Sequence, residues 1–332
     1  MPEILTLITV FISFFVTVSI LPYWIKRACR AKLVSKDVHK TDKKNVAELG
    51  GLAVVAGFLV GTLSYIGTKV FYFHVDANIT AIFATISAIL IATVIGLVDD
   101  ILGWKIGLRA RYKVLLTFFI ALPIMVINAG EPTMYVPFLG MIDFGLIYPL
   151  LLIPLAVMGT SNGFNMIAGY NGLEAGMGII ILSTLGFLSY LIGASFVAVI
   201  AFTMVASLFG FFVYNKYPAK IFPGDTLTYS VGALIAIIAI LMNIEKFALV
   251  LFVPYFMELA LKLRGKLKKE SFSDIADDGT LKLRYDKWYG LEHVALSFLK
   301  KGGLKTTEQN VVHSLYAFQL FFAGLSIMYY FL

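Results

Sequence analysis

The chain has 332 residues, of which 59% are hydrophobic and only 14% are charged, and its mean hydropathy is +0.87. A soluble domain carries about 25% charged residues, so this composition excludes an ordinary water-soluble protein and indicates an integral membrane protein. The single cysteine, Cys29, excludes an internal disulfide framework and a cysteine-based zinc site. The formal net charge is +7, but in a membrane protein the placement of charge along the chain is more informative than its total.

Ten apolar segments have lengths near the ~20 residues that a bilayer core requires. They cover approximately residues 4–25, 50–70, 79–98, 112–128, 144–161, 175–192, 194–214, 227–243, 246–263 and 310–331. The first lacks a basic region before it and a cleavage site after it, so we expect a retained span rather than a signal peptide. The sixth and seventh are separated only around Gly193, which leaves nine or eleven spans as alternatives. The sequence predicts an all-α polytopic membrane protein with about ten transmembrane helices in a single domain, residues 1–332.

Basic residues are concentrated in four loops that a count of ten helices assigns to one face. Residues 26–44 hold eight Lys or Arg, 103–113 hold four, 215–220 hold two and 262–305 hold eleven, which is 25 of the 27 in the chain. By the positive-inside rule this face is cytoplasmic, so both termini are outside. One helix more or fewer in the middle would divide these loops between two faces, so the charge pattern also supports ten.

The longest basic loop, residues 264–305, is predicted to fold as a small cytoplasmic lobe after the ninth helix. Asp278-Gly279 between two short β-prone runs favours a hairpin. Residues 288–301 follow with one apolar face and predict an interfacial helix.

Two adjacent carboxylates follow the uncharged run 81–98 on this otherwise basic face. Asp99 and Asp100 end the third apolar segment, and Arg109, Arg111 and Lys113 come within one short loop of them. Cations at this depth pair with lipid headgroups or clamp a diphosphate, and the sequence leaves both roles open.

The loop after the fifth segment, "MGTSNGFNMIAGYNGLEAG" at 158–176, belongs to the same face and carries Asn162, Asn165 and Asn171 among glycines. Glycines alone favour a helix-packing seam. Three amides argue for a binding role, because a buried amide without partners costs about 1–3 kcal/mol.

Asp225 follows Pro223-Gly224 in the next loop of this face, where it is either a helix N-cap or a metal carboxylate. Carboxylate and amide oxygens are hard ligands suited to Mg²⁺. Asp99, Asp100, Asn165 and Asp225 at one cytoplasmic mouth therefore predict Mg²⁺-dependent phosphoryl transfer that involves a lipid.

These motifs, in this order, resemble the polyprenyl-phosphate N-acetylhexosamine-1-phosphate transferase family. The resemblance rests on "GLVDD" at 96–100, the Asn-x-x-Asn pair at 162–165 and "FPGDT" at 222–226, and it covers nearly the whole chain. The loop 162–176 looks most like the dolichyl-phosphate branch, because Ala168-Gly169 stands where bacterial members have Asp-Gly. Arg264-Gly265-Lys266 is close to the basic Arg-x-Arg pattern of that branch.

The resemblance implies an enzyme that transfers GlcNAc-1-phosphate from UDP-N-acetylglucosamine (UDP-GlcNAc) to a polyprenyl phosphate of dolichyl type. UMP is released, and the step is the first committed one of lipid-linked oligosaccharide assembly for N-glycosylation. The implied catalytic residues are Asp99, Asp100, Lys113 and Arg264, and which of the two acids faces the metal stays open. The implied ligands of Mg²⁺, or alternatively Mn²⁺, are Asn165 and Asp225, and the implied substrate contacts are Gly50, Gly51, Leu52, Asn162, Asn171 and Lys266.

Two alternatives remain. The same chemistry on another UDP-HexNAc or a phospho-muramyl peptide changes only the donor. An ion-coupled secondary transporter is the distant alternative, disfavoured because the polar residues gather at helix ends and no inverted repeat is visible. The expected partners are the two substrates and the lipid bilayer, with no nucleic acid, and a homodimer is left open. We expect a cell-membrane protein with its active site facing the cytoplasm, or an endoplasmic reticulum protein if eukaryotic.

Some polar residues are not assigned to the predicted site. His39, His74, His293 and His313 are scattered without ligand spacing and are expected to be structural or solvated. Glu258, late in the ninth segment, is also left out, because its offset of six residues from Arg264 puts the two on different faces of a helix.

Overall fold

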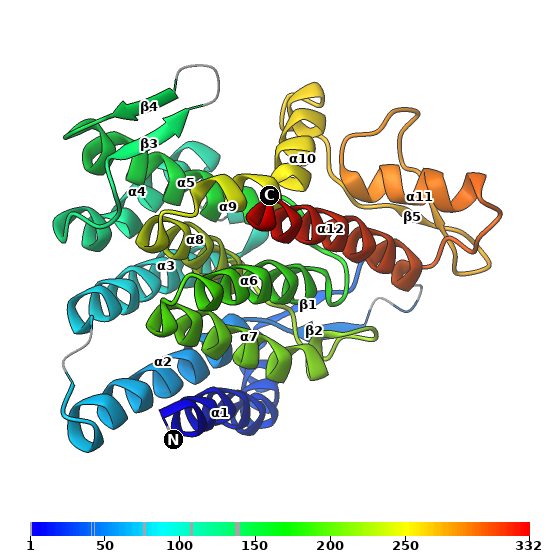
Figure 1. The fold of residues 1–332 in the computed structure, drawn as a ribbon. Helices are drawn as coiled ribbons and strands as arrows, with labels where there is room; N and C mark the ends of the chain where they lie inside the picture. Colours follow the sequence, from blue (N-terminus) through cyan, green and yellow to red (C-terminus); the bar gives the residue numbers. More distant parts are fainter. Residues whose placement is uncertain (1, 41, 43, 76–77, 107–108, 137–139) are drawn as a thin grey trace.

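Each of the ten apolar segments folds as a helix or as two consecutive helices. A computed structural model describes residues 2–40, 42, 44–75, 78–106, 109–136 and 140–332 (Figure 1). Helices suit these segments because they bond every backbone N–H and C=O internally, which a lipid environment requires. The helices, with η denoting π-helical turns, are α1 (Pro2–Arg30), α2 (Gly51–Gly67), η1 (Thr68–Tyr72), α3 (Ile79–Ile106), α4 (Ala110–Val126), η2 (Tyr148–Leu152), α5 (Ile153–Phe164), α6 (Leu173–Leu191), α7 (Ser195–Asn215), α8 (Asp225–Met242), α9 (Glu245–Leu251), α10 (Val253–Arg264), α11 (Leu291–Lys301) and α12 (Glu308–Phe331).

Seven helices in the described part of the chain are long and apolar enough to cross a membrane. They are Leu7–Arg30, Gly51–Tyr72, Ile79–Leu102, Leu173–Leu191, Ser195–Asn215, Asp225–Met242 and Glu308–Phe331. The prediction of a mostly helical, multi-pass membrane protein is confirmed. The count of ten and the orientation of the termini stay predictions, because α4, α5, α9 and α10 have 17, 12, 7 and 12 residues.

The described strands form three antiparallel hairpins outside the helices. They pair β1 (Val34–Lys36) with β2 (Asn45–Ala47), β3 (Thr133–Val136) with β4 (Gly140–Asp143), and β5 (Asp274–Ile275) with β6 (Leu281–Lys282). The third hairpin and α11 confirm that a hairpin and a helix form in this loop, and the interfacial position of the helix stays a prediction. The first two hairpins have no counterpart among the sequence predictions.

The core of the bundle surrounds α8, which packs against α3 and α5. Every residue of α8 from Thr226 to Ile240 is buried. A Cβ at Gly96 of α3 would overlap the backbone of Asp225 and Thr226, so a glycine there lets the end of α3 meet the start of α8. This close approach brings Asp99 and Asp100 next to Asp225.

The loops that carry the polar motifs meet at one end of the bundle. Phe222 donates its backbone N–H to the Ala47 carbonyl at 2.8 Å, which joins the loops after α7 and α1. Lys40 donates to the Asn171 side chain at 3.3 Å, and Ser273 donates its N–H to His39 at 3.4 Å. The loops after α1, α5, α7 and α10 therefore form one continuous polar end, as their assignment to one face predicted.

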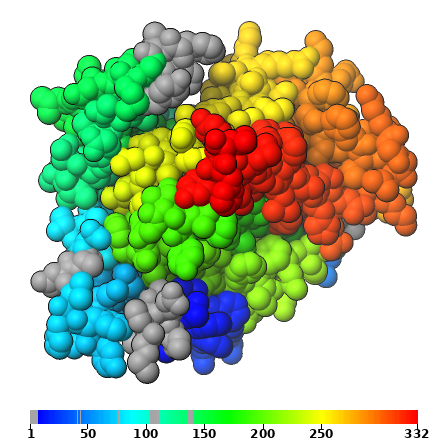
Figure 2. All heavy atoms as spheres, in the orientation of Figure 1, coloured from blue at the N-terminus to red at the C-terminus, as the bar shows by residue number. Residues whose placement is uncertain are grey.

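The ninth predicted span is broken into two helices. α9 ends at Leu251 and α10 begins at Val253, followed by Pro254, which suits the first turn of a helix because it has no N–H to bond. α10 then runs in a different direction from α9 (Figure 1). The lobe is anchored on it, since buried Glu258 accepts the Leu291 N–H at 2.6 Å, and the lobe projects from the bundle (Figure 2).

Candidate active site: a carboxylate–lysine centre beside an apolar groove

Asp100 caps the N-terminus of α8 from the end of α3. Its Oδ1 accepts the Asp225 N–H at 2.7 Å, and its Oδ2 accepts the Thr226 N–H at 3.0 Å and the Thr226 hydroxyl at 2.7 Å. Gly224, at φ +72°, allows the carboxylate to approach, because a Cβ at this position would overlap it. These bonds occupy both oxygens of Asp100, and the positive end of the α8 dipole stabilises its charge.

Asp99, Lys113 and Asp225 form a second arrangement, here called the carboxylate–lysine centre. The Lys113 ammonium donates to Asp99 Oδ2 at 2.5 Å and to Asp225 Oδ2 at 3.0 Å. The side chains of Asp99, Asp225 and Lys113 are 10%, 18% and 25% exposed, so the centre is sheltered but open to a ligand. Two carboxylates therefore share one ammonium.

Asn165 lies at the end of α5 on the other side of Asp225. Its side-chain oxygen accepts the Thr228 hydroxyl of α8 at 3.0 Å. The Tyr229 hydroxyl interacts with the side chains of both Asn165 and Asp225. The ends of α3 and α5 and the beginnings of α4 and α8 thus bring together Asp99, Lys113, Asn165 and Asp225, which the sequence analysis had named.

The oxygen atoms of these residues are of the type that a divalent cation binds, and those of Asp99 and Asp225 that bond to Lys113 point toward the same position. Oxygens of Asp99 and Asp225 already converge on one cation, the Lys113 ammonium. The Asn165 oxygen adds a neutral donor of the kind that Mg²⁺ accepts. Asp100 differs from Asp99, because both oxygens of Asp100 bond to the start of α8, whereas Oδ2 of Asp99 bonds to Lys113.

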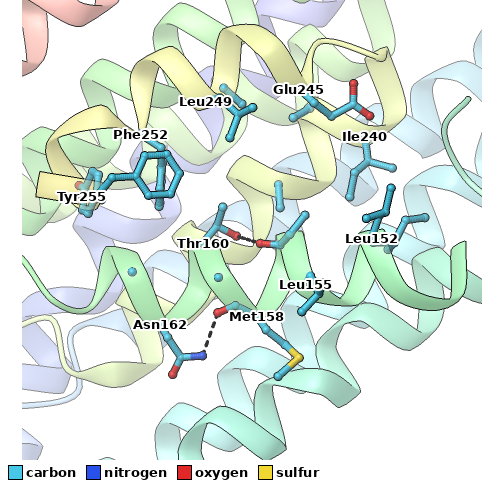
Figure 3. Close-up of a pocket in the computed structure, with 18 of the residues that line it drawn as sticks. Leu152, Leu155, Met158, Thr160, Asn162, Ile240, Glu245, Leu249, Phe252 and Tyr255 are labelled. Atoms are coloured by element: carbon cyan, nitrogen blue, oxygen red, sulfur yellow. Dashed lines mark hydrogen bonds between the residues drawn. The ribbon is translucent and has the colours of Figure 1, made fainter. Parts of the chain in front are cut away.

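An apolar groove of about 630 Å³ runs along α5. One end of the groove is lined by Val114 and Met166, the sequence neighbours of Lys113 and Asn165. The other end is lined by Glu245 and Tyr148, and the Tyr148 hydroxyl donates to Glu245 at 2.6 Å. Figure 3 shows Asn162 toward one end and Glu245 toward the other, with the side chains of α9 and α10 opposite α5.

The glycines predicted to contact the nucleotide have packing roles in the structure. The backbone N–H groups of Gly50 and Gly51 donate to the Phe222 and Pro223 carbonyls, both at 2.9 Å. A Cβ at Gly51 would overlap the backbone of Leu227. Leu52, half-buried, follows Gly51 in the first turn of α2. These bonds hold the loop after α1 against the "FPGDT" turn.

The remaining predicted site residues lie in three places: one lines the groove, one is buried in the interior, and two are exposed on the surface. The Asn162 amide donates to the Thr117 hydroxyl and the Met158 carbonyl, both at 2.8 Å, and lines the groove. Asn171 is 5% exposed and is bonded to residues the sequence analysis did not single out. Arg264 and Lys266 are exposed at the end of α10 and, among the described residues, make no hydrogen bond or ion pair with the centre.

A multi-pass helical protein that combines a carboxylate–lysine centre with an apolar groove fits the class of proteins that act on a charged group attached to a lipid. The sequence profile described as Glycosyl transferase family 4 matches residues 79–243, which include the centre. The chain belongs to this family.

Several curated proteins are similar to the chain over most of its length. A Saccharolobus solfataricus protein that carries the name UDP-N-acetylglucosamine–dolichyl-phosphate N-acetylglucosaminephosphotransferase is 37% identical over 97% of this chain and 96% of its own. A Dictyostelium discoideum protein with that name is 29% identical over 72% of this chain and 66% of its own. A Streptococcus pyogenes phospho-N-acetylmuramoyl-pentapeptide-transferase is 30% identical over 76% of this chain and 78% of its own. These similarities favour the predicted transferase over a transporter.

Proposed function

We propose that the protein transfers GlcNAc-1-phosphate from UDP-GlcNAc to a polyprenyl phosphate of dolichyl type and releases UMP. The observation that carries this proposal is the combination of the carboxylate–lysine centre with an apolar groove whose lining includes Val114 and Met166, the sequence neighbours of Lys113 and Asn165. A charged headgroup at the centre and a hydrocarbon chain in the groove match a lipid phosphate. The names of the Saccharolobus and Dictyostelium relatives support UDP-GlcNAc as the donor.

In this reaction an oxygen of the lipid phosphate attacks the β-phosphorus of UDP-GlcNAc, which carries the sugar. The bond from that phosphorus to the bridging oxygen breaks, and UMP leaves with the bridging oxygen. A phosphate monoester has a second pKa of about 6, so the nucleophile is largely deprotonated at neutral pH and no general base is required. Positioning and neutralisation of charge are then the main catalytic contributions.

Asp99, Asp225 and Asn165 would hold Mg²⁺, or Mn²⁺ in its place, which supplies positive charge to the diphosphate when bound. Lys113 would release its carboxylate partners to the cation and pair with phosphate oxygens instead. Asp100 would keep α8 in place through its bonds to Asp225 and Thr226. Arg264 and Lys266 would approach the phosphates from the end of α10.

The decisive experiment supplies purified protein in detergent with sugar-labelled UDP-GlcNAc, a dolichyl-type polyprenyl phosphate and Mg²⁺. The expected products are UMP and labelled lipid in equal amounts, with no product after chelation by EDTA. UDP-GalNAc and UDP-MurNAc-pentapeptide, each tested alone, measure donor preference. Product from a different donor and none from UDP-GlcNAc would replace the proposed sugar, whereas no product from any donor would refute the transferase.

We also propose that the centre faces the cytoplasm of a cell membrane. Cys29 tests this orientation, because it is the single cysteine of the chain and lies exposed near the end of α1, within the first basic segment, residues 26–44. A membrane-impermeant maleimide should label Cys29 in inverted vesicles and not in right-side-out vesicles or whole cells. A Cys29→Ser variant controls for background labelling, and labelling of intact cells would reverse the assignment.

A further inference from the structure

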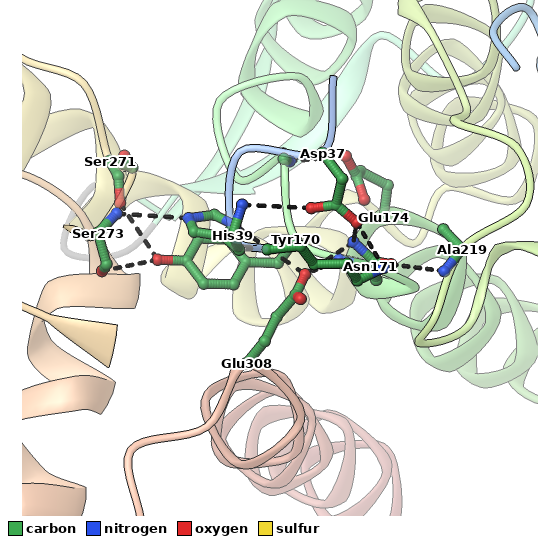
Figure 4. Close-up of polar contacts among 11 residues, drawn as sticks. Asp37, His39, Tyr170, Asn171, Glu174, Ala219, Ser271, Ser273 and Glu308 are labelled. Carbon is green, nitrogen blue, oxygen red and sulfur yellow. Dashed lines mark hydrogen bonds and ion pairs between the residues drawn. The ribbon is translucent and has the colours of Figure 1, made fainter. Parts of the chain in front are cut away.

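The lobe meets the bundle through two buried polar clusters. The first is here called the Asn171 network, and its members are Asp37, His39, Asn171 and Glu308 (Figure 4). The Asn171 backbone N–H and side-chain amide both donate to Glu308 Oε1, at 2.7 and 2.8 Å, and the amide also donates to Asp37 Oδ2 at 3.2 Å. The amide oxygen accepts the Ala219 N–H at 2.6 Å, and His39 accepts the Ser273 N–H of the lobe at 3.4 Å. Hydrogen-bond donors therefore reach both carboxylates of this cluster.

The second cluster joins α10 to α11 and is here called the lobe junction. Its members are Glu258, Lys262, Ser271 and Glu292. Glu258 Oε2 accepts the Leu291 N–H at 2.6 Å. Its Oε1 accepts the Ser271 hydroxyl at 3.3 Å and pairs with the Lys262 ammonium at 3.4 Å. Lys262 also donates to the Ser271 oxygen at 2.6 Å, so that Glu258 is surrounded by groups that bond to it and to one another.

Glu292 lies in the first turn of α11 with its side chain fully buried. Neither of its oxygens has a hydrogen-bond partner in the part of the chain that the structure describes, and the single proton of the neighbouring Ser271 hydroxyl is donated to Glu258. A Cβ at Gly290 would lie 2.5 Å from both Glu292 Oε2 and Ser271 Oγ. The same Cβ would lie 3.1 Å from Glu258 Oε1, so the three oxygens surround one position.

An ionised Glu292 would be unstable in this position. A buried carboxylate that accepts no hydrogen bond loses its hydration without compensation. Burial and the negative charge of Glu258 accordingly raise the pKa of Glu292 well above its usual value. The neutral carboxyl group can donate its proton, and Glu258 Oε1 and Ser271 Oγ are acceptors on the same side of Gly290. Neutral Glu292 therefore completes the junction that the ionised form would disrupt.

The other titratable groups around Glu292 do not take the place of this proton. From α10, the Lys262 ammonium favours ionisation, but it is already bonded within the junction. On α11, burial lowers the pKa of His293, so that its imidazole is neutral at neutral pH. The loop after α5 contributes the Tyr170 hydroxyl, and the first turn of α12 contributes Glu308, which is a further acid.

We propose that neutral Glu292 holds the lobe on α10, and that its ionisation releases the lobe as the pH rises. The inference is independent of the proposed function, because it concerns only how the lobe is held. In a released lobe Glu292 is exposed to water, and its pKa returns to the usual value of about 4.3. At any pH between that value and the raised pKa, the docked lobe carries one proton more than the released lobe. The equilibrium constant for docking therefore falls about tenfold for each unit of pH.

The test measures hydrogen–deuterium exchange of residues 288–301 in the full-length protein in detergent, from pH 6 to pH 8. Wild type, Glu292→Gln and Glu292→Ala are compared at each pH, so that the pH dependence of the exchange chemistry cancels. Glutamine has the shape of the neutral acid and keeps a donor, whereas alanine removes it. Glu270→Gln is the matched control, because it removes a partly exposed carboxylate of the lobe that pairs with Arg284.

The protection of α11 in the wild type, relative to Glu292→Gln, should fall about 100-fold between pH 6 and pH 8, a factor of ten for each unit. Glu292→Gln should show no such loss, and Glu292→Ala should be weakly protected throughout. Glu270→Gln should follow the wild type.

Equal protection of wild type and Glu292→Gln across this range would overturn the inference, and so would an alanine variant as protected as the glutamine variant. A glutamine variant that fails to fold would also contradict it, because glutamine is the isostere of the neutral acid. Loss of wild-type protection on addition of EDTA at pH 6 would assign the Glu292 oxygens to a bound cation instead of a proton, and would refute the inference as well. No substrate takes part in these measurements, so their failure leaves the proposed transfer reaction intact.

Discussion

The carboxylate–lysine centre and the Asn171 network contain similar side chains at the same end of the bundle, but they differ in exposure and in hydrogen bonding. In the centre, Asp99 and Asp225 share one ammonium and are 10% and 18% exposed. In the network, the side chains of Asp37 and Glu308 are 2% and 3% exposed and share the donors of Asn171.

This difference distinguishes a site whose side chains can exchange their ion-pair partners for a ligand from one whose side chains keep their hydrogen bonds and a fixed arrangement. A carboxylate pair that shares one partly exposed lysine can accept another cation if the lysine turns to an incoming phosphate. A buried network whose central amide has all its partners cannot release one without leaving an unpaired group. Mutations in the centre should therefore affect turnover, and mutations in the network should affect the stability of the fold.

The largest effect is expected for Asp225→Asn in the centre. Removal of one of the two charges that face Lys113 should lower kcat about 100- to 1000-fold through lost electrostatic stabilisation, without lowering the unfolding temperature. Asp274→Asn, which removes a carboxylate paired with Arg284 on the lobe surface, is the control and should remain active. Near-normal turnover of Asp225→Asn would exclude Asp225 from the centre's chemistry.

An intermediate effect is expected for Gly159→Leu in the groove. A Cβ at Gly159 meets no atom within 4 Å, so the leucine extends into the groove that we assign to the lipid chain. KM for the polyprenyl phosphate should rise about 10-fold, in line with the cost of overfilling a packed site, while KM for UDP-GlcNAc stays constant. Gly324→Leu, at an equally open position on α12, should change neither value. Equal effects of both variants would argue against lipid in the groove.

The smallest effect is expected for Asp100→Ala, and it should appear in stability. Loss of the cap on α8 should reduce the free energy of unfolding by about 1–2 kcal/mol. Asp99→Asn should retain stability and lose activity instead, because Asp99 faces Lys113 rather than the helix backbone. Thermal unfolding and turnover of the two variants, measured side by side, would contradict this division if Asp99→Asn were the less stable one.

Much of the fold could be predicted because its signals are local. Apolar runs of helical length predicted where the helices lie, and the positive φ of Gly193 accounts for the boundary between α6 and α7. The Asp278-Gly279 pair predicted the lobe hairpin because this turn signal is also local. The break at Phe252 and the first two hairpins were missed, since the sequence signals there are weak and long-range packing decides them.

The sequence predicted which residues belong to the candidate site but not which groups each of them contacts. Asp99, Lys113, Asn165 and Asp225 stand in motifs whose residue types show in the sequence, and all four come together. Asp100 has the same residue type as its neighbour, and only the approach of α3 to α8 separates a capping residue from one that faces the centre. Glu258 could be set aside from sequence alone, and the structure uses it to anchor the lobe.

The sequence by itself determined the class of protein, the helical segments and the residue types at the site, because hydropathy, charge and short motifs act over a few neighbouring residues. Only the tertiary structure decided that Asp37, His39 and Glu308 surround Asn171. Glu308 lies 137 positions from Asn171, and no local pattern marks it as its partner. Such contacts exist because burial forces each polar group to find a partner wherever the folded chain supplies one.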